Sequence, residues 1–169
     1  GEPLLVGDAA GINSLRRGRQ HRAEIDCVNA ELRKLNEELR VQAYFDALTG
    51  CRNRSYFFAE VASELTRAQR FAQPCSLAMI DIDHFKDVND RHGHATGDAL
   101  LKHFAQTVVA CLRSFDFVGR IGGEEFALLM PQTDLAAARE VAERIRRAVE
   151  AAVVSVVETG KSGLRFTVS

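Results

Sequence analysis

At 169 residues, with 46% hydrophobic and 27% charged residues, the chain has the composition of one domain plus an appendage and can bury a core. A formal net charge of −1 argues against a nucleic-acid-binding protein, because such proteins usually carry a strong basic excess. The four cysteines form no Cys-x-x-Cys pair, which argues against a zinc site or a disulfide framework. No apolar run is long enough to cross a membrane, so we expect no membrane contact within this chain. These properties are typical of a cytoplasmic protein, although a full-length parent could still be tethered to a membrane.

The N-terminal region divides into two parts. Residues 1–20 have no periodicity and are assigned only as a tail or the end of an upstream domain. Over residues 21–43, apolar side chains recur at spacings of three and four, as at heptad positions a and d: Ile25, Val28, Leu32, Leu35 and Leu39. Because the run covers fewer than three heptads, a lone helix that packs on its own domain stays open. We prefer a parallel two-stranded coiled coil that links to the domain at 44–169.

The rest of the chain alternates between helical and extended patterns. The expected elements are a helix at 54–71, a strand at 75–82, a loop at 83–97, a helix at 100–112, a hairpin around 122–123, a helix at 134–154 and a strand at 164–169. Asn53 is a good N-cap for the first of these helices. The nearly continuous apolar run at 75–82 is typical of a central strand covered on both faces. This order predicts an α+β fold with a mixed central β-sheet flanked by helices.

Two glycines, Gly122 and Gly123, are followed directly by two carboxylates, Glu124 and Glu125. We interpret the stretch as a hairpin whose tight turn needs glycine at positive φ. Taken alone, it is better explained by a solvated turn. Asp81 adds weight to a functional interpretation, because a carboxylate at the end of an apolar strand is costly unless it is hydrogen-bonded or metal-bound. If the two strands are neighbours, Asp81 and Glu124 form an all-oxygen site of the kind that Mg²⁺ prefers.

Three polar side chains follow Asp81 along the chain. Lys86 can pair with phosphate, Asn89 carries both a donor and an acceptor, and Asp98 can accept from the N1–H and N2–H edge of guanine. Such a set separates guanine from adenine, because the wrong base leaves polar groups unpaired. Each of these side chains alone is better explained by local backbone hydrogen bonds.

Together these motifs closely resemble the GGDEF family of diguanylate cyclases. The matching stretches are Asp81-Ile-Asp-His-Phe-Lys86, Asn89-Asp90, Gly93-His94, Gly97-Asp98, Arg120-Ile-Gly-Gly-Glu-Glu-Phe126 and, as the motif that opens the domain, Asp46–Arg54. The resemblance extends from about Tyr44 to the end of the chain. It implies a palm like that of nucleotidyl cyclases and polymerases, which condenses two GTP molecules into cyclic di-GMP and releases pyrophosphate. It also implies a homodimer through the N-terminal signalling helix, with two sites face to face.

The resemblance assigns roles to individual residues. Asp81, the Ile82 carbonyl and Glu124 would hold Mg²⁺ (or Mn²⁺). Glu124 would also assist deprotonation of the attacking hydroxyl, and Lys86 would stabilise phosphate charge. The residues implied for substrate binding are Phe85, Asn89, His94, Asp98, Gly122, Gly123 and Glu125. Arg113 and Asp116 resemble the family's Arg-x-x-Asp site for inhibition by the product, in which arginine meets phosphate or guanine and aspartate meets the N1–H and N2–H edge.

The chain departs from the family pattern in two ways that bear on activity. Glu124 stands where aspartate is usual, a change that keeps the carboxylate. The family continues past a Thr-Val-Ser strand into a further helix and strand with basic residues, so we expect the domain at 44–169 to be truncated. Two functions stay open: a product-inhibited, Mg²⁺-dependent diguanylate cyclase active as a dimer, and a weak or inactive module that binds cyclic di-GMP or GTP. We prefer the cyclase because Asp81, Lys86 and Glu124 are all present.

Overall fold

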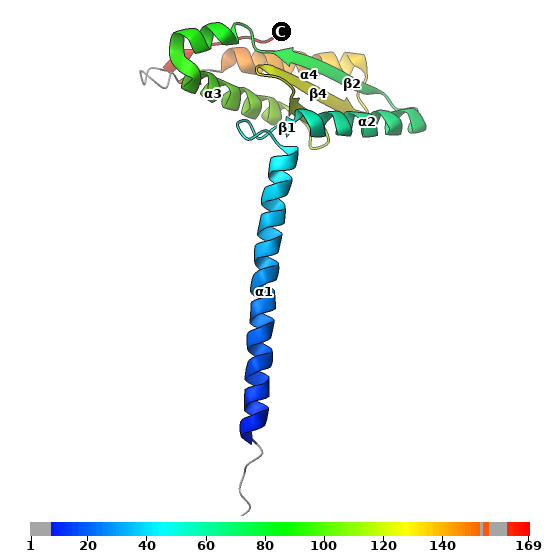
Figure 1. Cartoon of the computed structure of the whole chain (residues 1–169). Helices are drawn as coiled ribbons and strands as arrows, with labels where there is room; N and C mark the ends of the chain where they lie inside the picture. Colours follow the sequence, from blue (N-terminus) through cyan, green and yellow to red (C-terminus); the bar gives the residue numbers. More distant parts are fainter. Residues whose placement is uncertain (1–7, 153, 156–161) are drawn as a thin grey trace, which may run out of the picture. The chain divides into compact units, whose positions relative to one another are not determined.

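The computed structural model describes residues 8–152, 154–155 and 162–169, and the chain divides into a helical unit that ends at Val41 and a domain that begins at Gln42 (Figure 1). The first seven residues of the tail lie outside the described residues. The elements are α1 (Asp8–Tyr44), β1 (Arg52–Asn53), α2 (Arg54–Phe71), β2 (Cys75–Asp81), α3 (Phe85–Cys111), β3 (Phe117–Arg120), β4 (Glu125–Pro131), α4 (Leu135–Ala151), β5 (Val154–Ser155) and β6 (Ser162–Leu164). The α+β fold with a mixed sheet and flanking helices is confirmed.

The helix α1 is continuous and begins at Asp8, ahead of the heptad pattern that starts near residue 21. Its apolar side chains at the a and d positions are all exposed by 47% or more: Ile25, Val28, Leu32, Leu35 and Leu39. They form one apolar stripe along the helix, and in a coiled coil such a stripe of a and d side chains is covered by a second helix. None of the helices in the described part of the chain is long and apolar enough to cross a membrane.

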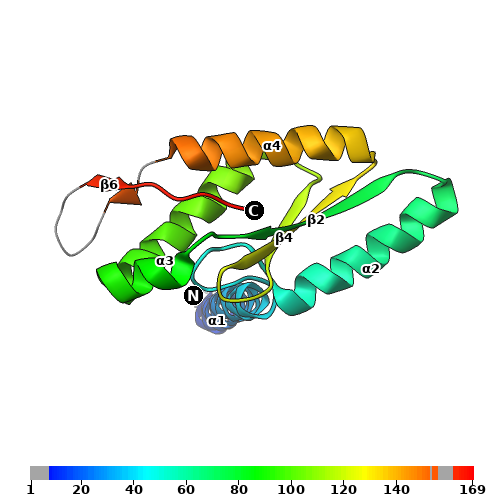
Figure 2. The same ribbon diagram turned by 90° about the horizontal axis from the view of Figure 1, so that it is seen from above.

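The main sheet has the strand order β1-β3-β4-β2, in which β1 pairs parallel with β3 and the other pairs are antiparallel. Helices α3 and α4 cover one face of the sheet, and α2 covers the other (Figure 2). The central, fully covered strand is β4, which is buried from Phe126 to Pro131. The prediction that residues 75–82 form the strand covered on both faces is wrong, because Leu77 and Met79 of β2 are 51% and 58% exposed.

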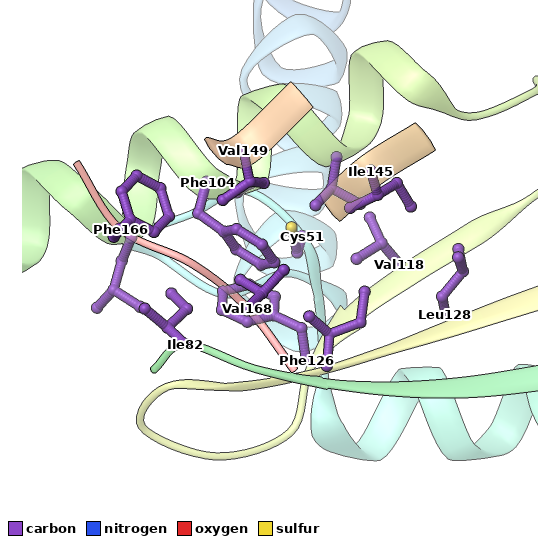
Figure 3. Close-up of a cluster of buried hydrophobic side chains, with 14 of the residues drawn as sticks. Cys51, Ile82, Phe104, Val118, Phe126, Leu128, Ile145, Val149, Phe166 and Val168 are labelled. Carbon is purple, nitrogen blue, oxygen red and sulfur yellow. The ribbon is translucent and has the colours of Figure 1, made fainter. Parts of the chain in front are cut away.

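The larger core lies between the sheet and the helices α3 and α4 (Figure 3). Its aromatic centre is Phe104 of α3, whose ring packs edge-on against Phe126 of β4 at a centroid distance of 4.7 Å. On the opposite face, Phe57 of α2 packs on Gly119 of β3, where an added Cβ would lie 2.6 Å from the phenylalanine ring. Glycine at 119 therefore allows α2 to pack directly on the backbone of β3.

The segment predicted as a loop at 83–97 is helical from Phe85 onward, and only residues 83–84 form a turn. Helix α3 begins at Phe85 and runs to Cys111, with a single non-helical residue, Gly93 (φ 76°, ψ 159°), at a kink. Glycine takes this positive φ without a Cβ clash, so the helix can change direction there. The polar residues that indicated a loop lie on a short helix that buries only Phe85 and Val88 before the kink. The predicted N-cap is confirmed, since the Asn53 side chain accepts from Tyr56 N at 2.9 Å.

Candidate active site

The turn from Ile121 to Glu124 joins β3 to β4. The backbone N–H groups of Ile121 and Gly122 both donate to the carbonyl of Glu125, at 2.9 and 3.2 Å. The expectation of positive φ at the glycines is wrong, because neither Gly122 nor Gly123 lies in the left-handed region. A Cβ at Gly122 would collide with the Glu125 carboxylate, whereas nothing lies within 4 Å of a Cβ built at Gly123. Gly122 therefore makes room for the Glu125 carboxylate, Gly123 leaves open space, and neither supplies an unusual backbone conformation.

Three carboxylates come to this end of the β2–β4 pair. Asp81 is exposed at the end of β2 and lies directly opposite Glu125 in the antiparallel register. The side chains of opposed residues in an antiparallel pair project from the same face of the sheet, so the carboxylates of Asp81 and Glu125 lie on the same face. Glu124 is half-buried in the turn, one residue earlier. The strands are neighbours, as a site of Asp81 and Glu124 requires, and Glu125 is the cross-strand partner of Asp81.

Asp83, two residues after the end of β2, binds the C-terminal segment. Its two oxygens accept from Thr167 Oγ1 at 2.7 Å and from Ser169 Oγ at 2.8 Å. These two hydrogen bonds hold the pKa of the Asp83 carboxyl below its ordinary value. Asp81 and Ser169 also exchange backbone N–H···O bonds at 2.9 and 3.1 Å. Thr167 and Ser169 thus bind the end of β2 along the edge opposite β4. The Asp81 side chain remains exposed.

Across the kink in α3, the predicted guanine-binding residue Asn89 lies against Gly97, which directly precedes the other one, Asp98. A Cβ at Gly97 would collide with Asn89 Oδ1 and would lie 3.3 Å from the Phe85 ring. The first turns of α3 therefore pack directly against the backbone just before Asp98. Lys86 is exposed on the first turn, and His94 is exposed just after the kink. The helix gathers all five predicted residues, Phe85, Lys86, Asn89, His94 and Asp98, within its first half.

The turn before β3 is closed by its own aspartate. Asp116 Oδ2 accepts from the backbone N–H of Arg113 at 2.9 Å, and Asp116 N donates back to Arg113 O at 3.1 Å. The other oxygen, Oδ1, is buried and has no hydrogen-bond partner among the described residues. The Arg113 side chain is exposed, with its guanidinium 5.8 Å from the ring centre of Phe115. Arg144 of α4, which the motifs did not flag, donates to Cys111 O at 2.8 Å beside this turn.

Two further arginines reach the turn after β3, and the sequence analysis assigned a role to neither. Arg54 Nη1 donates to Ile121 O at 2.9 Å, and Arg120 Nη2 donates to Gly123 O at 2.7 Å. Both arginines lie inside motif stretches, which is the only signal that the sequence offers for them, because no periodicity marks an arginine that binds a backbone carbonyl.

The carboxylates at the end of β2 suit a hard cation. No group of three or more His, Cys, Asp or Glu side chains within the described ranges is arranged to hold a metal by itself. Asp81 and Glu124, with the backbone carbonyl of Ile82, offer only oxygen atoms. Mg²⁺ prefers such a small set of protein oxygens when phosphates supply further ligands, so the residues present fit this ion.

Comparisons with known proteins point to one family. Residues 43–169 match the family model described as "Diguanylate cyclase, GGDEF domain". The chain is 44% identical over 140 residues to the diguanylate cyclase DgcM of Escherichia coli (strain K12), which covers 82% of this chain and 32% of DgcM. It therefore spans about a third of that relative's length.

Two solved structures are similar in fold. The coiled coil and GGDEF domain of DgcB from Caulobacter crescentus, in complex with c-di-GMP, matches with a TM-score of 0.81 and 30% identity, over 89% of this chain and 79% of that one. The active GGEEF domain of a diguanylate cyclase from Vibrio cholerae matches with a TM-score of 0.62 and 33% identity, over 70% of this chain and 72% of that one.

Proposed function

The chain belongs to the GGDEF family of diguanylate cyclases, and we propose that it condenses two GTP molecules into cyclic di-GMP and pyrophosphate. The observation that carries the proposal is the meeting of Asp81 with the Glu124–Glu125 pair at one end of the β2–β4 ladder. In each half-reaction the 3′-oxygen of one GTP forms a bond to the α-phosphorus of the other. The bond from that phosphorus to the pyrophosphate leaving group breaks, and the hydroxyl proton passes to a base.

Asp81, the carbonyl of Ile82 and Glu124 are the residues proposed to hold Mg²⁺ or Mn²⁺. A bound divalent cation would neutralise phosphate charge in the transition state. Glu124 is also the proposed base for the 3′-hydroxyl, and the exposed Lys86 balances negative charge on the phosphates. The main task of the protein is then to position the reactants, which is typical of phosphoryl transfer.

We assign the guanine to the first half of α3. Asn89 and Asp98 supply the hydrogen bonds to guanine, and Phe85 and His94 are the other residues of this guanine-binding region. The packing of Asn89 against Gly97 supports this assignment, because it places Asn89 beside the residue that precedes Asp98. Gly122 and Gly123 leave the turn open to the nucleotide, and Glu125, opposite Asp81, supports a second metal ion.

The proposed enzyme is a homodimer that forms through α1. A dimer is needed because each protomer holds one GTP, and the two GTP molecules must come together to react. The exposed stripe of α1 supports this, as does the similarity to a DgcB structure that includes a coiled coil. Changing Leu32 and Leu35 together to Gln should lower both the dimer fraction in sedimentation and the activity. Val41→Gln is the matched control, because Val41 is 50% exposed on the same helix but lies outside the stripe. An unchanged dimer fraction in the double variant would place the interface elsewhere.

Arg113 and Asp116 are the proposed inhibitory site for the product. The buried Oδ1 of Asp116 supports this, since an acceptor without a partner among the described residues can take a hydrogen bond from guanine. Asp116 is only 8% exposed, so a ligand that uses this oxygen must first displace part of the turn.

The direct test is to incubate the dimeric protein with GTP and Mg²⁺ or Mn²⁺ and to measure cyclic di-GMP by mass spectrometry. We expect steady product formation that slows as the product accumulates. A dimer that binds cyclic di-GMP but makes none would contradict the cyclase and favour a regulatory module that binds the nucleotide.

A further inference from the structure

The turn from Ile121 to Glu124 is held by side chains from outside it. Arg120 donates to the carbonyl of Gly123 through both Nε, at 3.1 Å, and Nη2, at 2.7 Å. Because Gly123 has open space around it and no unusual φ, the glycines themselves do little to fix the turn. The guanidinium of Arg120 therefore sets the position of the peptide that leads into Glu124.

Arg120 is in turn oriented by Asp46. Its Nη1 donates to Asp46 Oδ1 at 3.1 Å, and the two side chains are only 16% and 24% exposed. Asp46 has little freedom, since its carboxylate also accepts from Thr49 N at 2.9 Å and from Thr49 Oγ1 at 2.7 Å. The parallel pairing of β1 with β3 aligns Asn53 with Arg120 and brings the Asp46 turn to this position.

Asp46 lies just after the end of α1. The last turn of α1 is attached to the domain, because Asn53 Nδ2 donates to Ala43 O at 2.8 Å and the rings of Tyr44 and Tyr56 are 4.5 Å apart. Arg120, which pairs with Asn53 across the parallel strands, thus contacts both Asp46 and Gly123.

We propose that Asp46 is a positioning residue for the reaction, which acts through Arg120 to hold the Gly123 carbonyl and thereby the carboxylate of Glu124. This inference rests on the proposed cyclase activity. The opposing explanation is that Asp46 only caps its own turn, as many aspartates do. The two explanations differ in what should change when the charge of Asp46 is removed.

The test compares Asp46→Asn with Asp134→Asn in the whole chain. Asp134 is the matched control, because it accepts from Ala137 N at 2.9 Å as Asp46 accepts from Thr49 N, but it caps α4. In Asp46→Asn we expect kcat to fall about tenfold while KM for GTP stays within about twofold, since a displaced catalytic group slows the chemical step more than binding. Asp134→Asn should change neither constant.

A second measurement does not depend on turnover. The amides of Ile121 and Gly122 donate to Glu125 O, so their hydrogen exchange reports the order of the turn. Their exchange should speed up in Asp46→Asn and not in Asp134→Asn. If the wild-type protein makes no cyclic di-GMP, the cyclase proposal fails, but this exchange measurement still decides whether Asp46 holds the turn.

A double-mutant cycle with Arg120→Ala separates positioning from capping. If Asp46 acts through Arg120, then adding Asp46→Asn to Arg120→Ala should have little further effect on kcat or on exchange. An equal effect in both backgrounds, or unchanged kcat and exchange in Asp46→Asn alone, would overturn the inference.

Discussion

The turn before β3, at Arg113–Asp116, and the turn after it, at Ile121–Glu124, lie at opposite ends of one short strand but are held by different parts of the chain. The first is closed by hydrogen bonds between residues three apart. The second is held by Arg54, 67 residues away from Ile121, and by Arg120, which is itself oriented by Asp46 from 74 residues away. The proposed product site is thus closed by local hydrogen bonds, whereas the proposed catalytic turn combines local hydrogen bonds with contacts from Arg54 and Asp46, which are distant in sequence.

This difference in how the two turns are held determines which activity, catalysis or product binding, is lost first when the domain is destabilised. A locally closed turn needs little of the rest of the domain, whereas the turn after β3 loses its contacts whenever the start of α2 or the Asp46 turn is displaced. We therefore expect conditions that loosen the domain to abolish catalysis before they abolish product binding.

The largest expected effect comes from Glu124→Gln, which removes a metal ligand and a base but keeps the shape of the side chain. Turnover should fall on the order of 100-fold or more, because a group that acts on transition-state charge is lost. Binding of cyclic di-GMP, measured by calorimetry, should be unchanged because Arg113 and Asp116 are not altered. Glu140→Gln, an exposed glutamate on α4, is the control. Loss of product binding in Glu124→Gln would mean that the two turns are not independent.

The next effect should come from Gly119→Ala, on the strand that connects the two turns. The added Cβ would lie 2.6 Å from the ring of Phe57, so α2 must move away from β3. The free energy of unfolding in urea should fall by about 1–3 kcal/mol, the usual cost of overpacking a core. Gly123→Ala is the control, because nothing lies within 4 Å of its Cβ, and its stability should stay within about 0.5 kcal/mol of wild type.

Features that depend on local sequence could be predicted, and features that depend on distant contacts could not. The N-cap at Asn53 and the order of the main helices and strands as far as α4 follow from residue type and periodicity, and the structure has them. The strand predicted at 164–169 is wrong in its bounds, because β6 ends at Leu164 and Val168 forms only an isolated bridge with Ile82. The hydrogen bond from Arg54 to Ile121 O and the contact of Arg120 with Asp46 could not be predicted, because contacts between residues 67 and 74 positions apart leave no pattern in the sequence.

Two errors in the predicted fold have physical causes of the same kind. The strands β2 and β4 are both apolar runs, and only their places in the sheet make β4 the covered one and leave Leu77 and Met79 of β2 exposed. The start of α3 has the composition of a loop because most of its side chains face solvent, and the helix is secured by the burial of Phe85 and Val88. In both cases tertiary burial decided between states that local sequence left nearly equal.

Asp116→Asn tests the local turn. Asparagine can still accept from Arg113 N, but its amide replaces an oxygen that would accept from guanine. We expect the affinity for cyclic di-GMP to fall about tenfold, the usual range for a lost bidentate contact to guanine. The initial rate at low product should stay within about twofold of wild type, because the turn after β3 is untouched. A fall in the initial rate equal to that in product affinity would show that the two turns are coupled.

The smallest effect should appear at low pH and belongs to the turn held from a distance. Partial burial acts to raise the pKa of Asp46, but hydrogen bonds from Thr49 and Arg120 outweigh it and leave this pKa below its ordinary value. A lowered pKa in the folded state stabilises the protein above the unfolded-state pKa of about 3.9, and this contribution is lost as the pH falls through the folded-state value. Urea unfolding between about pH 3 and 6 should therefore show a shallower loss of stability in Asp46→Asn than in wild type, by about 1 kcal/mol, the upper end of the range for exposed ion pairs, because both side chains of the Asp46–Arg120 pair are mostly buried. Identical slopes would mean that Asp46 is not the charged partner of Arg120, and the turn after β3 would then depend on Arg54 and on Arg120 alone.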